Sequence, residues 1–272
     1  MTEQREGQEQ AFQSFLENLY AQVESSDSFQ KIRTKAWEQF LKLGLPTKKN
    51  DVFRYIRLNN FFANSYEISA ITDIAQSSID KHVLPECQQS VAIFINGHFS
   101  PMHSRLDAIP KNIVIETIAE GMKTYGSFLQ NQSTKSLKDE LDPFAALNAA
   151  VNRDGLFLYV PPKTMTETPL QLLNIIDAGS MPMFVTPRAQ IFVGMQSEIS
   201  VVSTLAVLSG ESYTFNMVAE FAIEDAAKAT YTQSAADLNA NIWHFDAVRA
   251  SLKRDSRFKT INVTSYSGCP HG

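Results

Sequence analysis

Cysteine is scarce in this chain, and no part of it is both long and apolar. Cys87 and Cys269 are the only thiols among 272 residues, which is too few to build a disulfide scaffold. No run of about 18 predominantly apolar residues is present, which excludes a membrane-spanning helix. Residues 1–10 are polar and acidic, unlike a secretory signal or an Arg-rich transit sequence. These features predict a cytoplasmic protein with no membrane partner.

The sequence also lacks the short motifs that mark common catalytic sites. It contains no Gly-rich phosphate loop, no Gly-x-Ser-x-Gly, no Cys-x-x-Cys and no His-Glu-x-x-His. Its net charge of −5 gives no reason to expect a nucleic-acid partner. Apolar residues make up 44% of the chain and charged residues 19%, as in a globular fold. We therefore predict no catalytic, cofactor-binding or metal-binding residue.

The last third of the chain does contain a repeat of about thirty residues. Residues 191–203, 221–233 and 250–262 each read as an apolar strand, a short polar turn and a second strand. Equivalent positions recur at spacings of 30 and 29 residues, as in Val193, Ile223 and Leu252, in Ser197, Ala227 and Ser256, and in Ile199, Ala229 and Phe258. A fixed period of this size is typical of stacked architectures. Because apolar and polar residues alternate within the units, we predict a β-solenoid. An ordinary antiparallel sheet with coincidental spacing is the alternative.

The first part of the chain shows helical periodicity instead. Apolar residues from Phe12 to Val23 recur at three- and four-residue steps and predict one buried helical face. A second helix is expected to start after Asp27 and Ser28, which suit the capping position. Gly44 is expected to end that helix.

Two further motifs mark local structure before the repeats. Asn96-Gly97 predicts a β-hairpin, because both central residues of such a turn need positive φ. Asp142-Pro143 predicts the start of a short helix, with Asp as the cap and Pro in the first helical position. Residues 156–160 form a continuous apolar run, typical of a strand buried on both faces. We place a domain boundary there, with a helical and mixed part at residues 1–160 and a β-helix core beginning at residues 161–272.

Several residues with metal-binding or nucleophilic side chains are interpreted as structural. His98 and His103 are five residues apart on one strand and so face opposite sides, which is poor geometry for a shared metal. His244 is interpreted as a histidine at the rim of the core. Cys87 has no basic neighbour in sequence to activate it and is interpreted as an inert thiol. Cys269 and His271 lack further ligands nearby, whereas a stable metal site needs about four.

Charged residues in the repeat turns raise a rival function. Glu224-Asp225 and Arg254-Asp255 could contribute carboxylates to a secreted-type β-helix carbohydrate-active enzyme. Such a site needs carboxylates stacked from successive turns, but the equivalent positions of the first unit carry Met195 and Gln196. We interpret these turns as solvated. Lys48, Lys49, Arg54 and Arg57 form a basic cluster, interpreted as a solvated face, with a dock for an acidic partner segment as the alternative.

Three segments carry a resemblance to a known family. Gly44 to Tyr55 reads Gly-Leu-Pro-Thr-Lys-Lys-Asn-Asp-Val-Phe-Arg-Tyr, and residues 93–100 read Ile-Phe-Ile-Asn-Gly-His-Phe-Ser. Residues 154–162 and 168–172 form the third segment. Together they resemble the SufB/SufD family of the SUF iron–sulfur cluster assembly system, and its SufD members in particular. Phe53 departs from the family, which more often has Trp there.

The resemblance implies a helical N-terminal region followed by a right-handed parallel β-helix, truncated here after its first few turns. It implies a non-catalytic scaffold subunit that works in a complex with SufB-like and SufC-like subunits. The iron–sulfur cluster would belong to the assembled complex, with no cofactor in this chain. The later β-helix turns and the C-terminal helical domain of the family are missing. A truncated remnant that no longer assembles is therefore a second alternative.

Two structural expectations follow. The last turn, around Phe258, Ile261, Val263 and Tyr266, is expected to expose apolar side chains and open strand edges and so to self-associate. In the segment from Gly44 to Tyr55, the aromatic rings of Phe53 and Tyr55 are expected to pack inside the N-terminal region, with Lys48 and Lys49 in water.

Overall fold

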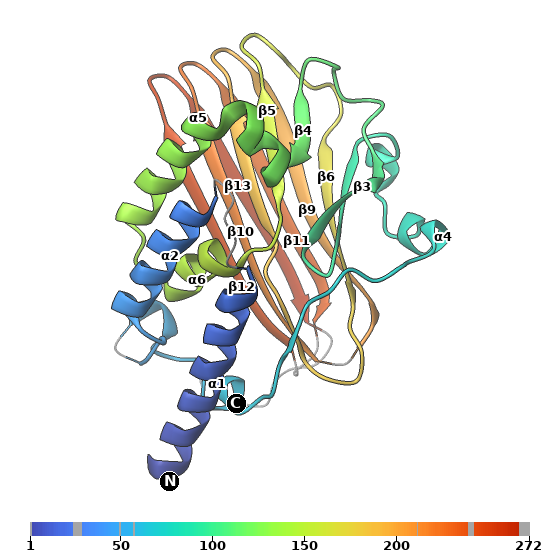
Figure 1. Cartoon of the computed structure of the whole chain (residues 1–272). Coiled ribbons are helices and arrows are strands. Elements are labelled where there is room, and N and C mark those ends of the chain that lie inside the picture. Colours follow the sequence, from blue (N-terminus) through green and yellow to red (C-terminus); the bar gives the residue numbers. More distant parts are fainter. Residues whose placement is uncertain are drawn as a thin grey trace.

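A computed structural model describes residues 2–23, 29–48, 50–56, 58–210, 212–238 and 242–266. Its centre is a parallel β-solenoid of about three turns, made of two facing sheets, with the long helices packed on one side (Figure 1). The fold is mainly β with an N-terminal helical region, as predicted. No helix in these ranges is both long and apolar enough to cross a membrane.

The chain alternates between the two sheets as it winds. Sheet A runs in the order β1-β7-β10-β8-β5-β4, with β12 also paired to β10. Its strands are β1 (Glu67–Ile68), β4 (Val114–Thr117), β5 (Leu156–Val160), β7 (Met183–Val185), β8 (Arg188–Val193), β10 (Tyr213–Ile223) and β12 (Ile242–Leu252). Sheet B runs in the order β13-β11-β9-β6-β2-β3. Its strands are β2 (Val91–Ile95), β3 (His98–Arg105), β6 (Leu170–Asp177), β9 (Glu198–Ser209), β11 (Lys228–Leu238) and β13 (Arg257–Tyr266).

Strand register confirms the predicted repeat. In sheet A, Ile223 of β10 pairs in parallel with Val193 on one side and with Leu252 on the other. In sheet B, the strands β9, β11 and β13 align Ile199, Ala229 and Phe258 in the same way. The predicted equivalent positions therefore lie side by side, and the antiparallel alternative is wrong. Alternate residues of both sheets point between them and form one apolar core, which includes Leu172, Ile191, Val201, Phe221 and Tyr231.

The turns between the sheets are stacked as regularly as the strands. The residue before each predicted small position has positive φ: Gln196 at 60°, Ala226 at 57° and Asp255 at 57°. Backbone hydrogen bonds join the turns, since Gln196 N donates to Asp225 O at 3.0 Å and Ala226 N donates to Arg254 O at 2.9 Å. The small position is required because its side chain is enclosed by the stack, as the buried Ser197 and Ala227 show.

One further turn belongs to this stack, although the thirty-residue repeat seen in the sequence did not include it. Lys163 also has positive φ, at 60°, and its N–H donates to Met195 O at 2.9 Å. Val160 pairs with Val193, so residues 156–164 form an earlier unit. The pattern was hidden because Pro161 and Pro162 occupy the turn itself and an irregular segment, rather than a regular strand, follows it.

Four helices cover the outer face of sheet A: α1 (Thr2–Val23), α2 (Gln30–Leu43), α5 (Ile118–Lys138) and α6 (Pro143–Val151) (Figure 1). Buried aromatic and aliphatic side chains of these helices and of the sheet form a second core, which includes Phe12, Leu16, Phe40, Phe144, Phe184 and Phe192. Two shorter elements complete this side, η1 (Asp51–Phe53) and α3 (Asn59–Phe62). Two others, α4 (Gln76–Asp80) and η2 (Pro85–Cys87), lie against sheet B instead. The domain boundary near residue 160 stays a prediction.

Local capping follows the sequence where the structure describes it. Gly44 ends α2 with φ of 70°, and its N–H donates to Phe40 O. The predicted caps Asp27 and Ser28 lie outside the described residues. Asp142 caps α6, as predicted, because its side chain accepts a hydrogen bond from Phe144 N at 2.9 Å.

The predicted hairpin joins β2 to β3. Asn96 and Gly97 have φ of 48° and 85° at the turn between these antiparallel strands. Asn96 is fully buried, and its side-chain amide donates to Ala70 O and Asp177 O, so the turn also anchors neighbouring segments. A Cβ on Gly97 would lie 3.2 Å from Thr186 N, which adds a packing reason for glycine.

The segment after α2 agrees with one aromatic prediction and contradicts the other. Phe53 is 4% exposed, and its ring centroid lies 5.5 Å from that of Phe144 and 6.5 Å from that of Phe245 in β12. Tyr55 is 90% exposed, so the prediction that it packs inside is wrong. The chain here is helically coiled, and residues two apart in a helix do not share a face. Lys48 is exposed as expected, and Lys49 lies outside the described residues.

Candidate functional site

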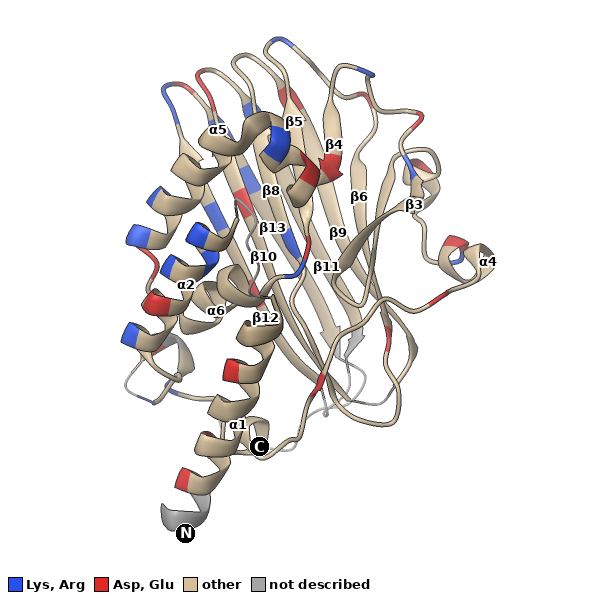
Figure 2. Cartoon of the chain, in the orientation of Figure 1, with Lys and Arg blue, Asp and Glu red and all other residues tan. Residues whose placement is uncertain are grey.

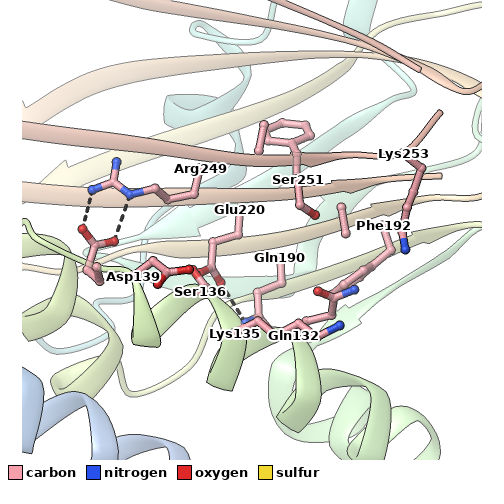
Figure 3. Close-up of a pocket in the computed structure, with 14 residues that line it drawn as sticks. Gln132, Lys135, Ser136, Asp139, Gln190, Phe192, Glu220, Arg249, Ser251 and Lys253 are labelled. Atoms are coloured by element: carbon pink, nitrogen blue, oxygen red, sulfur yellow. Dashed lines mark hydrogen bonds and ion pairs between the residues drawn. The ribbon is translucent and has the colours of Figure 1, made fainter. Parts of the chain in front are cut away.

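A row of three polar side chains crosses sheet A beneath helix α5. Gln190 of β8, Glu220 of β10 and Arg249 of β12 are paired neighbours in the parallel register, one from each successive turn of the solenoid. They are 30 and 29 residues apart, so they repeat the period of the apolar positions. Because residues at equivalent positions of a solenoid share one face, the three side chains all lie on the face of sheet A that the helices cover (Figure 3).

The centre of this row is a buried ion pair. Arg188 NH2 lies 2.8 Å from Glu220 Oε2, and the two side chains are only 3% and 15% exposed. Ser136 of α5 donates to Glu220 Oε1 at 2.6 Å, and Gln190 Nε2 donates to Glu220 Oε2 at 3.0 Å. Burial alone would raise the pKa of Glu220, but the charge of Arg188 and these hydrogen bonds outweigh it and lower the pKa. Glu220 is therefore a carboxylate that ties α5 to the sheet.

A second ion pair ties β12 to the helices. Arg249 donates from Nε to Glu140 Oε2 at 2.9 Å and from NH2 to Glu140 Oε1 at 2.7 Å. This two-point geometry is the strongest arrangement of guanidinium and carboxylate. The hydrogen bonds that Arg249 donates to Glu140, together with the charge of that carboxylate, raise the pKa of Arg249. The last strand of sheet A is thus fixed to the segment that leads into α6.

Beside this polar row the surface is hollow. A cleft of about 400 Å³ lies between α5 and the strands β8, β10 and β12. The cleft exists because Phe192 of β8 is paired, across β10 and β12, with the small residues Ala222 and Ser251. These three residues form the row next to Gln190, Glu220 and Arg249. Lys135 of α5 and Lys253 at the end of β12 also line the cleft (Figure 3). Its volume suits a small molecule.

The solenoid has a second distinctive region at its last described turn. Strands β12 and β13 each pair with one neighbour, so each has an edge without a strand partner among the described residues. Ile261 and Val263 of β13 are 37% and 54% exposed, as expected, while Phe258 packs partly on the core beside Phe221. The side chain of Tyr266 lies outside the described residues.

The histidines are separated in space. His98 approaches Ser69 O at 3.5 Å, and burial lowers its pKa, whereas His103 Nδ1 lies 2.8 Å from Ser100 Oγ. His244 is half-buried between the sheets, with Nε2 2.6 Å from Asp246 Oδ2. No group of three or more His, Cys, Asp or Glu residues in the described part of the chain could hold a metal ion.

The remaining sequence candidates are also accounted for. Cys87 is fully buried with its Sγ 3.4 Å from Pro169 O, and burial raises the pKa of its thiol.

In the turns between the sheets, the carboxylate of Asp225 accepts a hydrogen bond from Arg254 N at 3.1 Å, so Asp225 stacks against Arg254 rather than another carboxylate. Figure 2 shows both charge signs along this row of turns. Arg54 pairs with Asp51 on the surface. Arg57, Cys269 and His271 lie outside the described residues.

Sequence reasoning missed the row of Gln190, Glu220 and Arg249. A signal for it was present, because the three residues recur with the same spacing as the aligned apolar positions. The partners on α5 were not readable, since Ser136 is 84 residues from Glu220 in the chain. Only the docking of the helix on the sheet brings the two side chains together.

Comparisons with known proteins match the chain along nearly all of its length. Residues 6–172 match the family described as SufBD protein N-terminal region. Residues 174–269 match the family described as SUF system FeS cluster assembly, SufBD core domain. The junction between the two matches falls in β6, the strand that follows the predicted boundary.

Individual relatives are distant. An iron–sulfur cluster assembly SufBD family protein of Synechocystis sp. is 22% identical over 233 residues, which cover 81% of this chain and 50% of that protein. The iron–sulfur cluster assembly protein SufD of Bacillus subtilis is 19% identical over 224 residues, covering 80% and 51% respectively. The SufB protein of the same organism is 23% identical over 164 residues, covering 56% and 35%. The chain spans about half the length of the first two relatives.

Proposed function

This chain belongs to the SufB/SufD family, and we propose that it is a non-catalytic scaffold subunit for iron–sulfur cluster assembly in the cytoplasm. The observation that supports this most is the continuous match of both family regions, from residue 6 to residue 269 with one residue between them. The parallel solenoid with a helical layer on one sheet is consistent with such a role, since a rigid two-sheet body offers extended surfaces for other proteins.

The proposed partners are SufB-like and SufC-like subunits. Support for a SufB-like partner comes from the relatives, because one of them is named SufD and another is named SufB. The strands β12 and β13 offer the surface, because edge strands present N–H and C=O groups that can pair with another chain. The exposed side chains of Ile261 and Val263 add apolar area beside that edge.

A scaffold role also agrees with the chemistry of the candidate site. Glu220 is held by Arg188, Ser136 and Gln190, and such a carboxylate is not free to act as a general base. The half-buried imidazole of His244 pairs with Asp246 and packs edge-on against the ring of Phe215. In this proposal the cluster is cargo that is built on the complex, and this chain supplies shape and docking surface.

Co-purification tests the proposal. The tagged chain is co-expressed with the SufB-like and SufC-like subunits of its own organism, and we expect all three to elute together. Val263→Lys should weaken the complex because it places a charge beside the β13 edge. Ile71→Lys, at an exposed apolar residue far from that edge in the fold, is the matched control. A chain that always elutes alone, while the other subunits assemble clusters without it, would contradict the proposal.

A further inference from the structure

The cleft between α5 and sheet A has a hydrogen-bond acceptor without a partner. Gln190 is 1% exposed, and its Nε2 donates to Ser133 Oγ at 2.9 Å and to Glu220 Oε2 at 3.0 Å. These two acceptors fix the orientation of the amide. Its Oε1 is buried and receives no hydrogen bond from any described residue. A buried acceptor left in this state is costly, so it is a position that a ligand with an N–H or O–H donor would satisfy.

The mouth of the cleft carries positive charge that is not neutralised locally. Arg188 and Arg249 are engaged with Glu220 and Glu140, but neither Lys135 nor Lys253 has an ion-pair partner in the described part of the chain. One exposed carboxylate, that of Asp139, also lines the cleft. Two ammonium groups therefore stand against one carboxylate, and this balance favours an anionic ligand.

The cleft also has apolar surface. Phe192 forms one wall, and Ala222 stands beside it as its partner on β10, in the row next to the polar row. The space that the small side chains of Ala222 and Ser251 leave open is part of a hollow of about 400 Å³. This volume exceeds what a simple inorganic ion needs and falls within the range of small-molecule sites.

We propose that this cleft binds a small organic anion with a flat apolar body and an N–H donor at the end opposite to its charge. The donor meets Gln190 Oε1, the body lies against Phe192 and Ala222, and the anionic group is held by Lys135 and Lys253. This inference is independent of the scaffold function, since it depends only on the described cleft.

Three related bicyclic probes test each part of the proposal by isothermal titration calorimetry on the whole chain. Indole-3-acetate has the ring N–H, the flat body and the carboxylate. Naphthalene-1-acetate keeps a flat bicyclic body and the carboxylate but has no N–H donor, and 3-methylindole keeps the ring N–H but has no carboxylate. We expect saturable binding of one indole-3-acetate per chain, with each of the other two probes weaker by about tenfold. Changing the ligand in this way tests Gln190 without disturbing its structural hydrogen bonds.

Two variants place the binding in the cleft. Lys253→Glu should weaken indole-3-acetate by about tenfold, because it replaces attraction with repulsion at the mouth. Lys259→Glu is the matched control, since Lys259 is an exposed residue of β13 that does not line the cleft. Ser251→Tyr, at an exposed position, should fill the hollow and abolish binding while unfolding remains unchanged.

The results separate cleanly. Preference for indole-3-acetate over both analogues, lost in Lys253→Glu and Ser251→Tyr but kept in Lys259→Glu, supports the proposal. Absence of saturable binding at about 10 mM of all three probes overturns it. Equal affinity for the two acetates, or equal effects of Lys253→Glu and Lys259→Glu, also overturns it, because binding would then be a general charge effect.

Discussion

The guanidinium of Arg188 in β8 lies 2.8 Å from the carboxylate of Glu220 in β10, and α5 covers the pair through Ser136. The two residues belong to successive turns of the solenoid, so the pair joins neighbouring turns and also holds the helical layer. Replacing one partner of such a pair leaves the other charge buried without compensation.

We therefore expect Glu220→Gln to lower the free energy of unfolding by about 3–5 kcal/mol. The double variant Arg188→Met with Glu220→Gln should recover much of that loss, because no unpaired charge remains. Urea unfolding of the wild type, both single variants and the double variant measures the coupling. Additive effects in this cycle would show that the two side chains do not interact energetically.

Asp154 predicts a specific pH dependence. Burial raises its pKa to about 6, even though Gly155 N donates to it at 2.9 Å. A carboxyl group whose pKa is higher in the folded than in the unfolded state stabilises the fold when protonated. Its contribution is present below about pH 4, the unfolded pKa, and is lost as pH rises through about 6.

Relative to Asp154→Asn, the wild type should therefore lose about 2 kcal/mol of stability between about pH 4 and pH 7. Chemical unfolding of both proteins across this range gives the difference directly. Asp107→Asn, at an exposed carboxylate, is the control and should track the wild type. A constant difference between wild type and Asp154→Asn at every pH would refute the raised pKa.

Phe53 and Tyr55 form a natural pair for mutagenesis, since they are two residues apart and differ in burial. Phe53→Ala should cost about 3–5 kcal/mol, because it empties a site packed between Phe144 and Phe245. Tyr55→Ala should change stability by less than about 0.5 kcal/mol, as at other surface positions. Thermal or urea unfolding decides, and a large loss in Tyr55→Ala would mean that its ring packs against something in solution.

The edges of β12 and β13 that have no strand partner among the described residues predict self-association. The isolated chain should form dimers or larger species at concentrations of tens of micromolar, because edge strands with exposed apolar neighbours recruit further strands. Light scattering should show this for the wild type and for Ile71→Lys, and much less for Val263→Lys. A wild-type chain that stays a monodisperse monomer at these concentrations would contradict this prediction.

The chain alone should hold neither a stable cluster nor stoichiometric iron, because a cluster is normally held by about four thiolates and this chain has two cysteines. Anaerobic reconstitution, followed by visible absorption and iron analysis, measures this. One cluster per chain that disappears in Cys269→Ser would reverse the prediction.

Much of the solenoid was determined by the sequence alone. The spacing of Val193, Ile223 and Leu252 predicted strand register, because every turn of a solenoid repeats one set of neighbours. Asn96-Gly97 predicted the hairpin and Asp142-Pro143 the start of α6. Such features depend on neighbouring residues or on one period, so they are readable along the chain.

Other features were decided only by tertiary structure. Tyr55 is exposed and Phe53 is buried, although both are aromatic, because the orientation of one short turn against α6 and β12 selects between them. The cleft exists because α5 docks across Gln190 and Glu220, whose partners Ser133 and Ser136 come from a distant part of the chain. Periodicity predicts which residues share a face, but the partner of that face depends on how the helices pack, and no local pattern encodes it.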